Sequence, residues 1–197
     1  MAETFNPVGN KAPTSIVPPE VSNTANSIAF ELMLESLFLS ELLQEMWFVR
    51  GQVVDVLHSP VDAYGYDVVL QSGGVTRHVQ LKTKRLTGKT ASYKLSTLLY
   101  NQPAACVVVL EWELPPGSSR LALQYRWFGG GPHEPIPHLG EKVAKHTKGD
   151  SLGVKKEKPL HRVVALGKFA KVSSMTGLVD LLFDPREAND GALPPPS

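Results

Sequence analysis

The chain has 197 residues, of which 42% are hydrophobic and 20% are charged, and its formal net charge is +1 at pH 7. This length and apolar content predict one compact domain with a sizeable core. The single cysteine, Cys106, lies in an apolar run and excludes an internal disulfide, which favours a buried thiol in a reducing, cytoplasmic protein.

The two ends of the chain differ in composition from its middle. Residues 1–24 mix proline with Asn, Ser and Thr, and residues 185–197 finish in three prolines. We expect flexible arms at both ends of a single domain that spans residues 25–184. The start lacks a basic region followed by an apolar stretch, and four glutamates interrupt the apolar segment 28–49, so no membrane span is expected.

The first expected element is a helix over residues 26–47. Its apolar stripe, which we expect to face the core, consists of Ile28, Leu32, Leu39, Leu43 and Met46. Helical spacing also gathers four glutamates, at positions 31, 35, 41 and 45, within about a third of the circumference. Glu35 lies at the edge of the apolar stripe and is therefore the acid best placed to turn toward a sheet.

Strands are expected next, at residues 52–57, 66–71 and 76–83. Residues 105–112 form a continuous apolar run of the kind found in a central strand. We expect residues 93–100 to cross over to that strand as a helix. Further strands are expected at 121–127 and within 161–172, before a last helix at 175–183, which gives an α/β order.

A tight turn at Gly73-Gly74 defines a hairpin, because glycine adopts the positive φ angles that such turns need. The turn pairs Ser72 with Val75, Val68 with Val79 and Asp67 with Gln80. Strand alternation then puts Lys82 on the same face as Asp67 and Gln80. The opposite face is apolar apart from Arg77, and we expect it to pack on the core.

A carboxylate, an amide and an ammonium on one strand face suit metal-assisted hydrolysis of a phosphodiester. Oxygen ligands hold a hard cation such as Mg²⁺, and a neighbouring lysine orients or deprotonates a water. The alternative is that Asp67 and Lys82 form an ordinary exposed cross-strand pair.

The order of Asp67, a hairpin and Gln80-Leu81-Lys82 resembles the PD-(D/E)XK nuclease superfamily, in a variant with glutamine in the last motif. The run from Glu35 to Leu43 followed by Trp47-Phe48-Val49 is similar to the helix-to-strand entry of small bacterial members. The resemblance covers residues 27–111.

This resemblance implies a restriction-endonuclease-like core, with a central mixed sheet flanked by helices in αβββαβ order. It also implies a homodimer and an Mg²⁺ site, which Mn²⁺ can substitute, with Asp67, Gln80 and Glu35 as ligands. Asp62 is the rival first acid.

Basic residues follow the hairpin motif. Residues 77–94 contain six Lys and Arg and no acid, as a polyanionic substrate would require. Lys84, Arg85 and Lys89 leave the catalytic strand directly and are expected to contact DNA, and His78 shares the polar face with Gln80. A second basic run lies in residues 142–171, and residues 129–159 are either a solvated, flexible loop or a further DNA contact.

We therefore expect an Mg²⁺-dependent deoxyribonuclease, more an endonuclease than an exonuclease, with Lys82 as the group that orients or deprotonates water. Two alternatives stay open. One is a nuclease-fold module that binds nucleic acid without cleaving it, and the other is an interaction domain whose polar hairpin face is coincidental.

Overall fold

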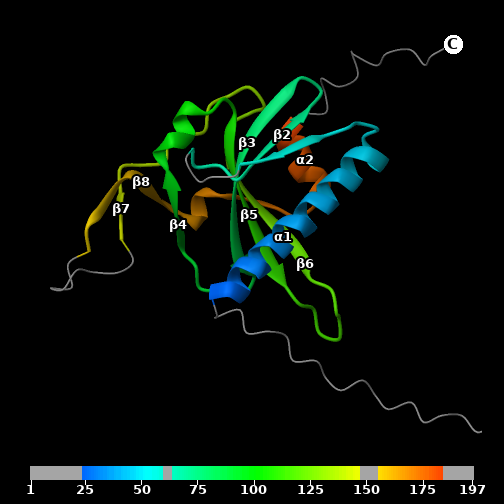
Figure 1. Ribbon diagram of the computed structural model, residues 1–197, viewed down its shortest axis with the longest axis horizontal. Helices are drawn as coiled ribbons and strands as arrows, with labels where there is room; N and C mark the ends of the chain where they lie inside the picture. Colours follow the sequence, from blue (N-terminus) through cyan, green and yellow to red (C-terminus); the bar gives the residue numbers. More distant parts are fainter. Residues whose placement is uncertain (1–23, 60–63, 147–154, 184–197) are drawn as a thin grey trace, which may run out of the picture.

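The computed structural model describes residues 24–59, 64–146 and 155–183. Its fold is mixed α/β, with helices packed against a central mixed sheet and a second, smaller sheet beside it (Figure 1). The expected arms, 1–24 and 185–197, lie outside the described residues except for Thr24. No helix in the described ranges is both long and apolar enough to cross a membrane.

The central sheet has six strands in the order β1-β2-β3-β5-β6-β9. All neighbouring pairs are antiparallel except β3 and β5, which are parallel. The strands are β1 Asp55–His58, β2 Val68–Ser72, β3 Val75–Arg85, β5 Ala105–Glu113, β6 Ala122–Gly129 and β9 Ala170–Val172.

The hairpin register predicted from the Gly73-Gly74 turn is confirmed for β2 and β3. Ser72 faces Val75 and Val68 faces Val79. The φ angles of Gly73 and Gly74 are 54° and 81°, as a tight hairpin turn requires. Because β3 continues to Arg85, its second half extends beyond the end of β2.

The crossover between β3 and β5 differs from the prediction. Residues 93–100 do not form an α-helix, but a strand, β4 Ser92–Ser96, and a 3₁₀ helix, η2 Thr97–Asn101. Tyr93 and Leu95 turn inward while Lys94 is exposed, which is a period of two, and the Ser96 hydroxyl accepts the Leu98 N–H to start the 3₁₀ turn. β4 pairs with β8 Glu157–Ala165, which pairs with β7 Val143–Lys145.

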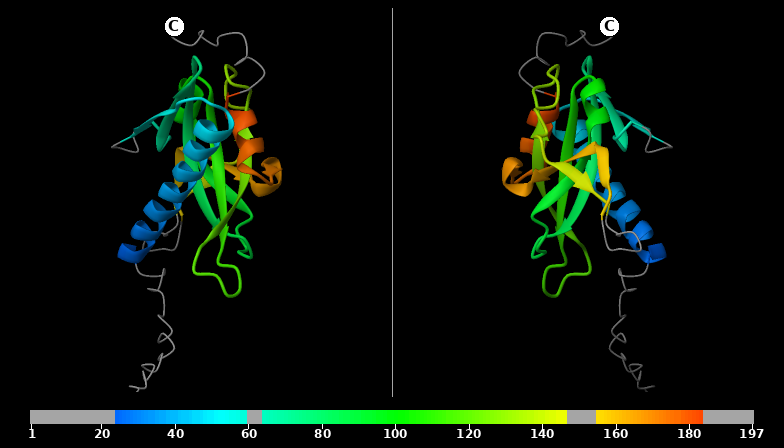
Figure 2. Two further views of the ribbon diagram at one scale, coloured as in Figure 1. Left: turned by 90° about the vertical axis from the view of Figure 1, so that its right-hand side faces the viewer. Right: turned by 90° about the vertical axis from the view of Figure 1, so that its left-hand side faces the viewer.

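The first helix, α1 Thr24–Gln44, crosses the strands obliquely (Figures 1 and 2) and ends in a π-helical turn, η1 Glu45–Val49. The apolar stripe predicted for the core is wrong for most of its members: Ile28 is 56% exposed, Leu32 59% and Leu43 39%. A neighbouring stripe faces the core instead, consisting of Leu34, Phe38, Leu42 and Met46. The helix is apolar on more than one side, so packing decides which side is buried.

Both faces of the central sheet are covered. Side chains of α1 and of α2 Met175–Phe183 share one core cluster with β2, β3 and β5, and the other face packs on β4, η2 and β8. The face of β3 expected to be solvated is therefore largely buried, with Gln80 6% and Lys84 8% exposed. Tyr66, expected among the residues of the first face, packs against the second cluster.

Arg77, the polar exception on the core face, is fully buried. Its guanidinium donates hydrogen bonds to the carbonyls of Gly130 and Gly131 and lies 4.9 Å from the centre of the Trp127 ring. Cys106 is also buried, and burial raises the pKa of its thiol to about 11. Both side chains are therefore part of the interior of the fold.

Candidate active site

A cavity of about 370 Å³ opens where β3 extends beyond β2. Its polar lining comes from three parts of the chain: α1 contributes Glu31 and Glu35, the approach to β2 contributes Asp67, and β3 contributes Lys82 and Thr83, with Tyr93 of β4 beside them. The cavity thus joins Glu35, Asp67 and Lys82, three residues that the sequence predicted for one site.

Asp67 is held by the free edge of β3. The β2–β3 pairing ends at Val68 and Val79, so the predicted pairing of Asp67 with Gln80 is not part of the ladder. Instead, the Asp67 N–H donates to the Val79 carbonyl at 2.9 Å, and the Leu81 N–H donates to Asp67 Oδ2 at 2.6 Å. The carboxylate satisfies a donor that has lost its strand partner, and this fixes its position in the cavity wall.

Glu35 is half-buried, and its Oε1 lies 2.9 Å from His58 Nδ1 at the end of β1. Glu31 lies one helical turn earlier and is exposed. Glu31 was not among the predicted site residues. Its spacing of four from Glu35 is the signal that places both carboxylates on one side of α1.

Tyr93 forms another part of the wall. Its hydroxyl donates to the Thr83 carbonyl at 3.3 Å. Burial, and then the charge of Glu111, raises the pKa of Tyr93 to about 12. The phenol is therefore a neutral hydrogen-bond donor at physiological pH.

The cavity is acidic, because Glu31, Glu35 and Asp67 face a single ammonium, that of Lys82. Within the described ranges, no three His, Cys, Asp or Glu side chains are grouped closely enough to enclose a metal ion. Proteins bind Mg²⁺ mostly through one or two carboxylates plus water and substrate oxygens. Asp67 and Glu35 fit this chemistry as a two-carboxylate donor set.

Gln80 does not line the cavity. Its side chain is buried, and its Oε1 has no hydrogen-bond partner in the part of the chain that is described. It lies on the face of β3 that the second sheet covers, and it is not among the residues that line the cavity with Asp67. The rival acid, Asp62, lies outside the described residues.

The residues predicted to contact nucleic acid have different environments. Lys84 is buried, and its Nζ donates to Glu111 Oε1 at 3.2 Å. Its ammonium is therefore not presented at the surface, where a DNA phosphate would lie. His78 Nδ1 lies 2.8 Å from the Pro103 carbonyl, with the imidazole edge-on to Tyr66. Arg85 and Lys89 are exposed, and the Arg85 guanidinium lies 5.8 Å from the centre of the Trp112 ring.

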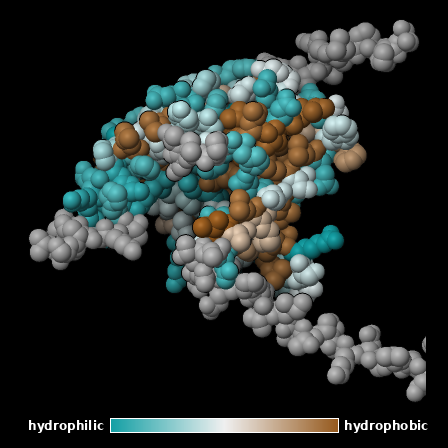
Figure 3. Space-filling model, in the orientation of Figure 1, coloured by the Kyte–Doolittle hydropathy of each residue, from teal (hydrophilic) through white to brown (hydrophobic). Residues whose placement is uncertain are grey.

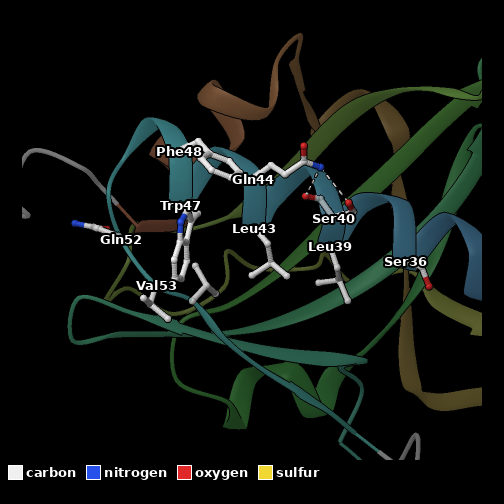
Figure 4. Close-up of a pocket in the computed structure, with 10 residues that line it drawn as sticks. Ser36, Leu39, Ser40, Leu43, Gln44, Trp47, Phe48, Gln52 and Val53 are labelled. Atoms are coloured by element: carbon white, nitrogen blue, oxygen red, sulfur yellow. Dashed lines mark hydrogen bonds between the residues drawn. The ribbon is translucent and has the colours of Figure 1, made fainter.

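A second hollow, of about 660 Å³, has the opposite character. We call it the apolar groove; its walls are Leu39, Leu43, Trp47 and Phe48 of α1 and η1, together with Val53 and Val54 before β1. The side chains of Leu39, Leu43 and Trp47 project from the helix toward Val53 (Figure 4). Trp47 is 61% and Phe48 80% exposed. Figure 3 shows hydrophobic side chains gathered on the face of the molecule that it presents.

The π-helical turn η1 explains this exposure. The Arg50 N–H donates to the Glu45 carbonyl, five residues earlier, so the turn is wider than an α-helical one. Arg50 also pairs with Asp180 of α2 at 2.6 Å. The wide turn keeps Met46 in the core while its next three residues, Trp47–Val49, face outward.

Comparison with known proteins yields no relative. No family model matches this chain, and no curated protein or solved structure shows a significant similarity to it.

Proposed function

We propose that this protein is a metal-dependent nuclease that hydrolyses DNA phosphodiester bonds, and that it acts as an endonuclease. One observation carries the proposal: Asp67, Glu35 and Lys82 line the same cavity at the free edge of β3. Two carboxylates and an ammonium around one hollow are the groups that metal-assisted phosphodiester hydrolysis requires.

Asp67 and Glu35 would hold Mg²⁺, with Mn²⁺ as a substitute, and Glu31 adds negative charge nearby. When bound, the cation stabilises charge on the phosphoryl oxygens and acidifies a water. Lys82 would orient a water as an ammonium or, in its neutral form, take a proton from the water; the resulting ammonium would offset the charge that develops on the phosphate. The Leu81 N–H keeps the Asp67 carboxylate in place throughout.

The resemblance to the PD-(D/E)XK superfamily supports the same reading. The chain runs helix, three antiparallel strands, crossover and parallel strand, and the matching acid and lysine lie on the hairpin β2–β3. The crossover departs from a restriction-endonuclease-like core, because β4 and η2 replace its helix. Gln80 also departs from the superfamily pattern, because its amide is buried and does not line the cavity.

DNA is the proposed partner, and Arg85 and Lys89 are the exposed cations that continue from the catalytic strand. Lysine and arginine contacts to phosphate give affinity without sequence preference. The buried, unpaired Cys106 supports a reducing, cytoplasmic setting.

A second candidate is a nuclease-fold module that binds nucleic acid without cleaving it. Two observations favour it: Gln80 is withdrawn from the cavity, and Glu35 already contacts His58. Cleavage then fails with every metal, while binding persists.

The test is nicking of supercoiled plasmid with Mg²⁺, Mn²⁺ or a chelator, using the wild type, Lys82→Gln and Lys168→Gln. Lys168 is exposed and lies outside the cavity, so it controls for loss of a positive charge. We expect metal-dependent nicking by the wild type and by Lys168→Gln, and none by Lys82→Gln. Binding of the plasmid without nicking would support the second candidate. If the protein neither binds nor nicks the plasmid, both candidates are rejected.

We also infer that the protein forms a homodimer through the apolar groove. Phe48 and Trp47 protrude beside a hollow lined by Leu39, Leu43 and Val53. A protruding ring next to a hollow is self-complementary under a two-fold axis, since each copy can fill the hollow of the other. Exposed apolar surface of this kind marks protein interfaces.

A further inference from the structure

A second polar cavity, of about 350 Å³, lies at the far end of β3 from the hairpin turn. We call it the basic cavity; its polar walls are Glu111, Gln124 and Arg126 of β5 and β6, Lys171 of β9, and Ser173. Leu86, just after β3, also lines it. The proposed nuclease site does not use any of these residues.

Among the described residues, the cations at this cavity outnumber the acids. Glu111 Oε1 lies 3.2 Å from Lys84 Nζ and 2.9 Å from Arg126 Nε, so one buried carboxylate serves two cations. Lys171 adds a third, because it stands directly opposite Arg126 in the β6–β9 ladder. Like charges directly opposite each other destabilise a sheet, and partly buried charges are costly without a counter-charge. An anion in the cavity would relieve both effects.

Arg126 is oriented for such an anion. Its Nε lies 2.9 Å from Glu111 Oε1 as an ion pair without the geometry of a hydrogen bond, and the side chain is 15% exposed. Among the described residues, none accepts a hydrogen bond from its two terminal nitrogens. A guanidinium held by one edge presents a planar pair of donors, which matches the oxygens of a phosphate.

One residue, Tyr93, relates the basic cavity to the candidate active site. Tyr93 lines the acidic cavity, and its hydroxyl donates to the Thr83 carbonyl. The charges of Glu111 and Arg126 also act on this phenol: Glu111 raises its pKa and Arg126 lowers it. Along β3, Lys82 and Leu86 are separated by roughly 13 Å at the usual rise of a strand. If β3 lies along the duplex axis, that distance corresponds to about four nucleotides of one strand, because each nucleotide advances about 3.4 Å along the axis.

We propose that the basic cavity binds a backbone phosphate of the nucleic acid, on the same strand as the bond that is cut and a few nucleotides away. The inference rests on the proposed function, since it takes nucleic acid as the polyanion. Arg126 supplies the paired donors, Lys171 supplies a mobile charge at the mouth, and Glu111 holds Arg126 in position.

The test is binding of a fluorescein-labelled 20-base-pair DNA duplex, measured by anisotropy in Ca²⁺ at several salt concentrations. Lys171→Gln removes the exposed charge, and Lys168→Gln is the matched control because Lys168 does not line the cavity. We expect Lys171→Gln to bind about 3- to 10-fold more weakly at low salt, with the slope of log K against log salt smaller by about one. The control binds as the wild type does.

Arg126→Lys is the second variant. It retains the charge beside Glu111 but loses the paired donors, and its melting curve checks folding. We expect its affinity to fall even where the fold is intact. Unchanged binding by both variants, or no binding of duplex by the wild type, would overturn the proposal. Weaker binding by the variants without nicking by the wild type would instead uphold this cavity and reject the nuclease.

Discussion

The acidic cavity and the apolar groove are both built on α1, yet they have opposite chemistry. Glu31 and Glu35 give the helix a charged side over the free edge of β3, while Leu43 and Trp47 give it an exposed apolar side near β1. A third side, which includes Phe38, packs on the sheet. One helix thus packs on the core and lines both the proposed reaction site and the proposed association surface. Substitutions on the two exposed sides should therefore change different measurements.

The largest expected effect is that of Asp67→Asn on nicking. The amide oxygen can still accept the Leu81 N–H, so the backbone contact persists while the negative charge is lost. We expect the nicking rate to fall by about 10²- to 10⁴-fold. The unfolding free energy should change by less than about 1 kcal/mol in urea denaturation. A large loss of stability would mean that Asp67 is structural.

Substitutions in the apolar groove should change self-association instead of nicking. Trp47→Ser together with Phe48→Ser removes the two protruding rings, and we expect dimer dissociation to be at least about 30-fold easier, or roughly 2 kcal/mol, by analytical ultracentrifugation. Leu114→Ser is the control, because Leu114 is 49% exposed but lies outside the groove. A wild type that is monomeric at high concentration would refute the dimer and point to a different partner.

Within the acidic cavity, substitutions of the two glutamates should differ in how much they raise the Mg²⁺ concentration that nicking needs. Glu35 is half-buried and positioned by His58, whereas Glu31 is exposed. Glu35→Gln should raise the Mg²⁺ concentration for half-maximal nicking by about 10-fold, and Glu31→Gln by about 3-fold or less. Titration of Mg²⁺ at fixed ionic strength measures both values. The reverse ranking would assign Glu31 as the ligand.

The smallest expected effect is that of salt on dimerisation through the apolar groove. Apolar association has little Coulombic component, so the dimer dissociation constant should change less than about 2-fold between low and moderate salt. DNA binding over the same range should weaken steeply. Sedimentation and anisotropy on one protein preparation compare the two regions directly. A strongly salt-dependent dimer would show that charges outside the groove hold the copies together.

Much of the fold follows from local sequence signals. The Gly73-Gly74 turn determines the register of β2 and β3, and the uninterrupted apolar run from Ala105 marks the central strand. The last helix has the predicted bounds, Met175–Phe183. These features depend on turn chemistry and burial within a few residues, which a sequence contains.

Other features depend on packing between distant segments. The core stripe of α1 could not be chosen from sequence, because Leu39 and Leu43 are as apolar as Phe38 and Leu42. Gln80 was expected on an open face, but β4 and β8 cover that face from positions far along the chain. That Asp67 and Lys82 share one site could be predicted from sequence, because both lie close to one hairpin. The approach of Glu31 to them depends on how α1 crosses the sheet.

A double-mutant cycle tests most directly whether Asp67 and Lys82 act as one hydrolytic site. Single-turnover nicking rates with Mn²⁺ would be measured for the wild type, Asp67→Asn, Lys82→Gln and the double variant. Groups that act on the same step are strongly non-additive, so the double variant should be within about 3-fold of the slower single variant. Rate losses that multiply in the double variant, or either single variant nicking at the wild-type rate, would contradict a shared site.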